Sequence, residues 1–186
     1  MTTYSNELDE FLAIAKELSF GYARLRVSAI EARGWVGIPL WCSLIPSWDE
    51  VTTLILALSK CGVDKLAWIG TEQYEVTDNP IQALTKQNIQ DAEFNQPLVR
   101  IMISGNKNFI MTSDTDLLRY AAGPIGLMEG IYGKPLSKYF DEMEEHTSSE
   151  YFRVRIPAQL QEDWLQDIAD LRNLLGSVEA KRSPAT

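Results

Sequence analysis

Four closely spaced carboxylates are the side chains most suited to chemistry in this sequence. Asp141, Glu142, Glu144 and Glu145 fall within five positions, and Lys138 is the only cation that offsets them locally. On a helix, carboxylates at i, i+3 and i+4 share one face and repel each other by roughly 0.2–0.5 kcal/mol per pair. Such a face steers a basic protein toward itself and speeds its association. A solvated helix surface has the same composition, so both interpretations stay open here.

A second group of candidates combines two carboxylates with a run of glycines. Asp114 and Asp116 precede the glycine segment 123–133, whose glycines are spaced by three, four and three positions. Paired carboxylates can bind Mg²⁺ or divide general acid and base roles. The segment matches neither the G-x-x-x-x-G-K-[ST] nor the G-x-G-x-x-G phosphate-binding pattern, so a tight loop or a closely packed helix is the other interpretation. Acids are also expected at a helix start, where both aspartates would lie.

Few residues are suited to metal binding or nucleophilic catalysis. His146 is the only histidine, which excludes a multi-histidine zinc site. Cys42 and Cys61 form no C-x-x-C motif, and their apolar neighbours predict buried structural thiols. No G-x-S-x-G motif marks a nucleophilic serine. We therefore assign no catalytic residue, no metal ligand and no cofactor, and we favour a non-enzymatic protein over an enzyme.

The charge balance excludes two classes of binding partner. Seventeen basic and twenty-six acidic residues give a net charge of −9. This acidity argues against nucleic-acid binding, which needs a surplus of Lys and Arg, and against docking on an anionic membrane. Residues 1–7 lack signal-peptide character, and no apolar stretch is long enough to span a bilayer. With two uncommitted thiols, these features predict a cytoplasmic protein.

The spacing of apolar residues predicts the helices that must position these side chains. Apolar residues at i, i+3, i+4 and i+7 are typical of an amphipathic helix. A capping box at Ser47–Glu50 begins one such helix, and Gly62 and Gly176 end two of them. The predicted helices cover 6–19, 48–61, 80–92, 113–121, 135–146 and 158–175.

Short or alternating apolar runs predict the strands. The clearest signal is a hairpin near 98–112, in which a Gly-Asn-Lys-Asn turn separates two apolar runs. Further predicted strands cover 65–69 and 151–156. Residues 22–32 fit a strand or a helix, and the interruption at Gly21 favours the strand.

The segment 34–48 has no clear period. It is rich in turn residues and in tryptophans, so we expect an irregular connection rather than a strand or helix. Most large apolar residues in a chain of this size must fill the core, and we predict the same for these tryptophans. They are Trp35, Trp41 and Trp48.

Together these elements predict a single α+β domain over 1–176, with a flexible C-terminal tail over 177–186. We expect an antiparallel or mixed sheet, including the hairpin, packed with about five helices. The last helix carries one apolar stripe that either joins the core or docks the chain into a larger assembly. The stripe consists of Leu160, Trp164, Ile168, Leu171 and Leu175.

The function that fits best is a non-enzymatic acidic protein-interaction module, such as an immunity- or antitoxin-type inhibitor of a basic partner protein. Its contact surface would be the four carboxylates of 141–145. The alternative is a small-molecule-binding domain or an enzyme of an unfamiliar kind, with its site near Asp114, Asp116 and the glycine segment 123–133. Neither the partner nor the oligomeric state follows from the sequence.

Overall fold

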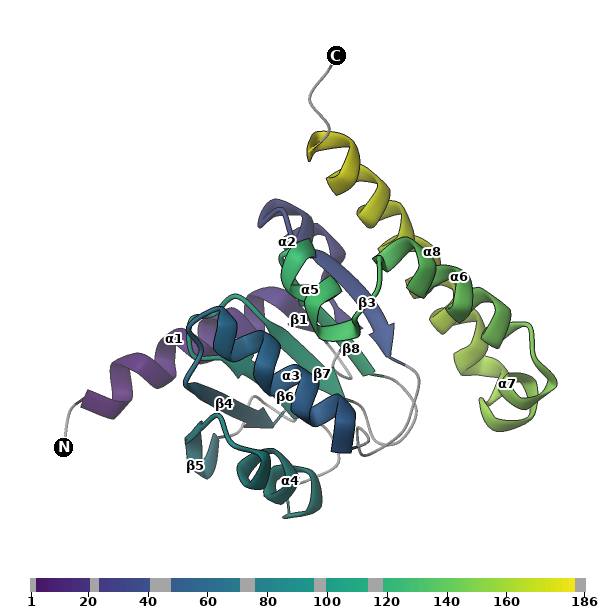
Figure 1. Ribbon diagram of the computed structural model, residues 1–186. Coiled ribbons are helices and arrows are strands. Elements are labelled where there is room, and N and C mark those ends of the chain that lie inside the picture. The colour runs from purple at the N-terminus through teal and green to yellow at the C-terminus, as the bar shows by residue number, and fades with distance from the viewer. Residues whose placement is uncertain are drawn as a thin grey trace.

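One six-stranded antiparallel sheet forms the centre of the molecule (Figure 1). This computed structural model describes residues 3–20, 24–40, 48–70, 76–95, 100–113 and 119–182. The strands of the sheet are β3 (Val36–Leu40), β4 (Lys65–Gly70), β5 (Val76–Ala83), β6 (Arg100–Ser104), β7 (Ile110–Ser113) and β8 (Arg119–Gly123). They are ordered β3-β8-β7-β6-β4-β5. The predicted α+β class is confirmed.

Eight helices and a two-stranded hairpin complete the described part of the chain, where about five helices were predicted. The hairpin pairs β1 (Ser19–Phe20) with β2 (Arg24–Leu25). The helices are α1 (Thr3–Leu18), α2 (Val27–Ala32), α3 (Trp48–Lys60), α4 (Lys86–Asn95), α5 (Ile125–Tyr132), α6 (Leu136–Thr147), α7 (Glu150–Arg155) and α8 (Ala158–Arg182). Among them, no helix combines the length and apolar character needed to cross a bilayer.

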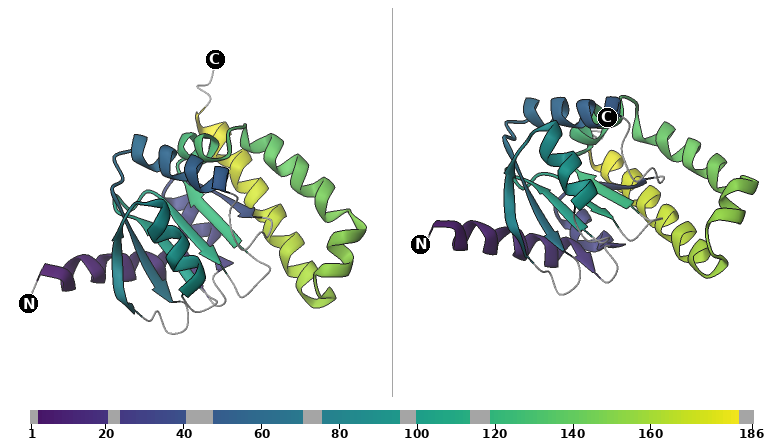
Figure 2. Two further views of the ribbon diagram at one scale, coloured as in Figure 1. Left: turned by 60° about the horizontal axis from the view of Figure 1, so that its bottom comes forward. Right: turned by 90° about the horizontal axis from the view of Figure 1, so that it is seen from below.

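The helices divide between the two faces of the sheet. Figure 2 shows α3 and α1 on opposite sides of the strands. A Cβ on Gly37 would meet Leu171 of α8 and Leu25 of β2, whereas a Cβ on Gly123 would approach α5. Because Gly37 pairs with Ala122, and successive residues of a strand alternate between faces, α8 and α5 lie on opposite faces. Burial on both faces explains why the strands read as apolar runs.

Several predicted elements are confirmed at their predicted positions. The hairpin near 98–112 is β6–β7, with Ile103 opposite Ile110. The helices predicted at 6–19, 48–61 and 135–146 are α1, α3 and α6, and the strand at 65–69 is β4. Trp35 is buried, as predicted for the core.

Both edge strands of the sheet contain a proline. Pro39 lies in β3 and Pro80 in β5. Proline cannot donate a hydrogen bond to the ladder, so a sheet accepts it at an edge. The Tyr139 hydroxyl of α6 donates to the Pro39 carbonyl oxygen at 2.7 Å, which occupies an acceptor on the free edge of β3. The irregular connection predicted over 34–48 is therefore wrong at 36–40, which form β3. The helix predicted to begin at Pro80 is wrong at 80–83, which belong to β5.

The strand predicted over 22–32 is wrong over 27–32, which form α2; Arg24–Leu25 is the short strand β2, and residues 22–23 lie outside the described part. Gly34 has φ +66° and ends α2. Its N–H donates to Glu31 O at 2.8 Å, and the Trp35 N–H donates to Ile30 O at 3.1 Å. This is the Schellman arrangement that a glycine permits after a helix.

Two further predictions assign the wrong type of element: a helix over 113–121 and a strand over 151–156. The helix predicted over 113–121 is wrong at 119–121, where β8 is buried throughout between the two helical layers. Residues 114–118 lie outside the described part. The strand predicted at 151–156 is α7: the Ser149 hydroxyl accepts from the Phe152 N–H at 3.2 Å and caps the helix. Phe152 and Ile156 are both buried, at a spacing of i, i+4 that a helix also satisfies.

The last helix does not end at Gly176. α8 continues to Arg182, Val178 is buried, and Lys181 Nζ lies 3.2 Å from Glu31 of α2. The predicted helix end is therefore wrong, while the domain over 1–176 stays a prediction.

Cys61 is exposed, contrary to the burial we predicted. Cys42, Trp41 and the side chain of Trp48 lie outside the described residues.

Candidate functional site

The four predicted carboxylates lie on the solvent side of α6. We call Asp141, Glu142, Glu144 and Glu145 the acidic face; all four are exposed. The helix is held by the opposite side, where its apolar residues are buried. Those residues are Leu136, Phe140 and Met143. Apolar residues at i, i+4 and i+7 occupy the side of α6 that faces the core, so the carboxylates between them lie on the side that faces solvent. The sequence pattern of α6 is enough to predict this orientation.

Two cations from outside the acidic run contact this face. Arg172 of α8 reaches it with both ends of its guanidinium: Nη2 lies 2.7 Å from Asp141 Oδ1, and Nη1 contacts Glu144. The hydrogen bond to Glu144 is the main cause of a raised pKa for Arg172. Lys134, just before α6, contacts Glu142. Among the described residues, Glu145 has no ion-pair partner.

These ion pairs leave the acidic face available to a partner. The side chains of Asp141 and Glu144 remain 64% and 55% exposed in spite of their contact with Arg172. Exposed ion pairs contribute about 0–1 kcal/mol, so a better-placed cation can replace them. Four carboxylates against three nearby cations, Arg172, Lys134 and Lys138, still leave the face negative.

An exposed leucine of α8 lies beside the acidic face. Leu165 precedes Arg172 by seven residues, which is two helical turns, so both side chains leave α8 on the same side. Arg172 contacts α6 from that side, and Figure 1 shows α6 and α8 running next to each other. Leu165 is 45% exposed. The surface therefore combines negative charge with an apolar point of contact.

Of the second predicted site, the structure describes only the glycine segment 123–133. Asp114 and Asp116 lie outside the described residues. Gly126 and Gly130 occupy the exposed side of α5, where a Cβ would meet open space. The closely packed helix is therefore wrong at these two positions. Gly133 has φ +67° and ends α5, which is the requirement for a glycine there.

The apolar stripe of α8 packs into the core of this chain. Trp164, Ile168, Leu171 and Leu175 are buried within this chain, and Leu160 packs partly buried against the same core. His146 is half-buried in the last turn of α6. No group of three or more His, Cys, Asp or Glu side chains in the described ranges is arranged to hold a metal ion.

Sequence reasoning missed a polar network on the face of the sheet that α8 covers. The hydroxyl of Tyr120 in β8 donates to Asp167 Oδ2 of α8 at 2.5 Å, and the Arg24 guanidinium of β2 contacts Asp167 Oδ1. Asp163 adds a longer contact to Arg24, 3.6 Å. The hydrogen bond to Asp167 is the main cause of a raised pKa for Arg24. Because 143 residues separate Arg24 from Asp167, no local pattern could have indicated their contact.

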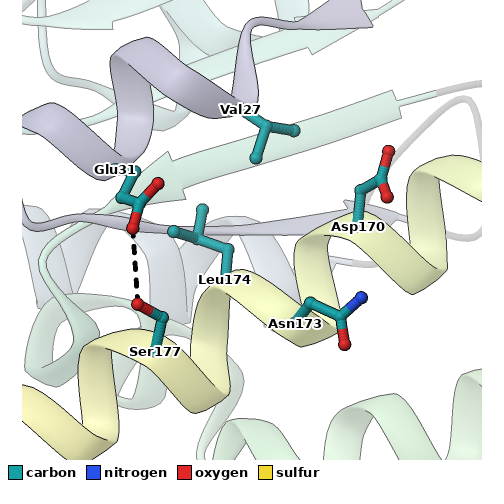
Figure 3. Close-up of a pocket in the computed structure, with 6 residues that line it drawn as sticks. All are labelled: Val27, Glu31, Asp170, Asn173, Leu174 and Ser177. Atoms are coloured by element: carbon teal, nitrogen blue, oxygen red, sulfur yellow. Dashed lines mark hydrogen bonds between the residues drawn. The ribbon is translucent and has the colours of Figure 1, made fainter.

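A shallow pocket lies between α2 and α8, also unforeseen (Figure 3). It has a volume of about 240 Å³ and is open to solvent. Val27 and Glu31 come from α2. The residues from α8 are Asp170, Asn173, Leu174 and Ser177. Its walls therefore offer acceptor groups around a small apolar floor.

Protein-family models, curated proteins and solved structures were compared with this chain, and none matches. Its function must therefore be inferred from the geometry and charge of its own side chains. Among the surfaces described, the acidic face is the one that both the sequence and the structure single out.

Proposed function

We propose that this chain is a protein-interaction module whose acidic face on α6 binds a basic partner protein. The observation that carries the proposal is the exposure of Asp141 and Glu144 while each contacts Arg172. Asp141 and Glu144 together hold the guanidinium of Arg172, and because both carboxylates are exposed to solvent, a cation of a partner protein can reach them as well.

The physical mechanism has two steps. An excess of carboxylates on one surface raises the local concentration of a basic protein and speeds the encounter. Short-range contact then decides the lifetime of the complex, because apolar and aromatic anchors usually dominate binding energy. Leu165 is placed to supply such an anchor next to the carboxylates.

The proposal extends to an inhibitor of the immunity or antitoxin type that acts by covering a functional surface of its partner. It also places the chain in the cytoplasm. The exposed free thiol of Cys61 supports that location, since free thiols persist in reducing compartments.

The test compares two variants with the same change in net charge. In the face variant, Asp141→Asn, Glu142→Gln, Glu144→Gln and Glu145→Gln remove the four charges. In the control variant, Asp9→Asn, Asp64→Asn, Asp91→Asn and Glu179→Gln remove four exposed charges elsewhere. Tagged protein of each kind captures partners from a lysate of its source, and association rates with the purified partner are then measured over a salt series.

We expect the face variant to associate roughly tenfold or more slowly at low salt, with a flatter salt dependence, and the control variant to stay close to wild type. Equal rates for the two variants would show that only net charge matters and would remove the acidic face from consideration. Loss of the partner's own activity on binding would support the inhibitor form of the proposal.

A further inference from the structure

The pocket between α2 and α8 has the composition of a receptor for an elongated cation. Val27 and Leu174 form an apolar floor, and oxygen-bearing groups stand at both ends (Figure 3). At one end Glu31 points toward Ser177, whose hydroxyl donates to it at 3.3 Å. Asp170 and Asn173 lie at the other end.

The charge in this pocket is only partly balanced. Lys181 Nζ lies 3.2 Å from Glu31 Oε1, so an ammonium group already reaches one end. The Asp170 carboxylate accepts a hydrogen bond from the Gln166 amide at 2.9 Å, and no cation contacts it in the described part of the chain. Asp170 is half-buried, which strengthens its attraction for a positive charge relative to a fully solvated carboxylate.

We propose that this pocket binds a guanidinium group on an apolar stem, as in an arginine side chain. The stem would lie on Val27 and Leu174, and the guanidinium would contact the Asp170 carboxylate, next to Asn173. Guanidinium suits the pocket better than ammonium for two reasons. It is more weakly hydrated, so an apolar floor opposes it less, and its five donors can serve several acceptors at once.

This site is independent of the acidic face. Asp170 and Arg172 are two positions apart on α8, which places them about 200° apart around the helix axis at 3.6 residues per turn. Asp170 therefore faces α2, on the other side of α8 from the contacts with Asp141. One site can fail its test without affecting the other.

The test is a titration of the full-length protein, followed by NMR. The reporters are the methyl groups of Val27 and Leu174 and the side-chain amide of Asn173. The probe is acetyl-Gly-Arg-Gly-amide, and its matched neutral control carries citrulline, which has nearly the same shape without the charge. Butylguanidine tests a free small molecule as the source of the same group, and acetyl-Gly-Lys-Gly-amide tests ammonium.

We expect the arginine peptide to shift all three reporters, with the citrulline peptide binding several-fold more weakly. Asp170→Asn should weaken binding of the arginine peptide roughly two- to fivefold, as for an exposed ion pair. Glu179→Gln removes an equal charge from the same helix outside the pocket and should leave it unchanged. Equal binding by butylguanidine would identify a free guanidine as a sufficient ligand, and stronger binding by the peptide would point to a protein.

Three results would overturn the proposal. The first is equal binding of the arginine and citrulline peptides, which would make charge irrelevant. The second is a set of shifts confined to α6, which would place the guanidinium on the acidic face instead. The third is an equal effect of Asp170→Asn and Glu179→Gln, which would reduce the interaction to net charge.

Discussion

Tyr120 shows how one side chain can connect two layers of this molecule. Its side chain projects from strand β8 and is buried, and its hydroxyl donates to Asp167 of α8. Asp167 in turn holds Arg24, so the network joins β8, α8 and β2. Buried polar groups raise stability only when they are satisfied, and a variant that removes the donor leaves the carboxylate with one partner fewer.

Tyr120→Phe should therefore lower the free energy of unfolding by about 1–2 kcal/mol, because a hydrogen bond to a charged acceptor is lost. Urea denaturation at neutral pH measures the change. Tyr139→Phe is the matched control: it removes a hydroxyl that donates to a neutral acceptor, the Pro39 carbonyl, and should have a smaller effect. A larger effect for Tyr139→Phe would contradict this account of Asp167.

The contact between Glu17 and Arg33 gives a prediction about pH. Arg33 donates to both carboxylate oxygens of Glu17, at 2.9 and 2.8 Å, and these hydrogen bonds are the main cause that lowers the pKa of Glu17 from its ordinary value of 4.5. As the pH falls, the unfolded chain takes up this proton before the folded chain does. The stabilisation is therefore complete well above pH 4.5 and is lost as the pH falls through the lowered folded-state pKa.

Glu17→Gln should accordingly lower the free energy of unfolding by about 0.2–1 kcal/mol near neutral pH, a small effect because the pair is exposed. The difference from wild type should shrink toward zero in acid. Urea unfolding of both proteins across a pH series tests this, and a difference that persists unchanged in acid would show that the ion pair is not its source.

At the scale of elements, two glycines of one short segment should respond in opposite directions to the same substitution. Gly130 lies in α5 with open space where a Cβ would go, so Gly130→Ala should stabilise the fold by about 0.5–1 kcal/mol. Gly133 has φ +67°, and Gly133→Ala should destabilise it by about 1–2 kcal/mol. Thermal and urea unfolding measure both. Destabilisation by Gly130→Ala would mean that α5 packs more tightly than described.

The end of α8 offers another element-scale prediction. A chain shortened after Gly176 loses the buried Val178 and the contact between Lys181 and Glu31. We expect a loss of about 1.5–3 kcal/mol in the free energy of unfolding, the value for burial of one aliphatic side chain. A chain shortened after Arg182 keeps both features and serves as the control. If the two shortened chains are equally stable, the domain indeed ends at 176.

The elements that sequence reasoning predicted correctly are those whose signals are local. α1, α3 and α6 repeat their apolar residues over three turns, and the β6–β7 hairpin contains its own turn. The elements it missed depend on distant neighbours. The alanines of β8 favour a helix in isolation, but five buried positions between two layers require a strand. Pro39 and Pro80 also mislead, because a strand accepts proline only at an edge, and the edge is set by the order of all six strands.

The candidate sites divide in the same way. The acidic face was predictable because its four carboxylates are adjacent in sequence and α6 is amphipathic. Its partner Arg172 was not predictable, since 31 residues separate it from Asp141. The α2–α8 pocket and the Tyr120 network join residues from opposite ends of the chain, and only the packing of α8 brings them together.

At the scale of the whole molecule, protection from hydrogen exchange should follow the layers. The four inner strands β4, β6, β7 and β8 are paired on both sides and covered by helices, so their amides should exchange slowest, close to global unfolding. α7 has six residues and should open locally and exchange much faster. Native-state hydrogen exchange measured by NMR tests this order. Equal protection of α7 and the inner strands would show that the helices α6–α8 unfold together with the sheet.

The position of β3 in the sheet has a consequence for synthesis on the ribosome. Among the described strands its single neighbour in the sheet is β8, and Ile38 pairs with Ala121, about eighty residues later in the chain. At about 5–20 residues per second, a nascent β3 waits on the order of 4–16 s for its partner. During that interval Gly37 and Pro39 reduce the tendency of this apolar segment to pair with other chains. The proline that marks an edge in the finished sheet is therefore also a safeguard for the growing polypeptide.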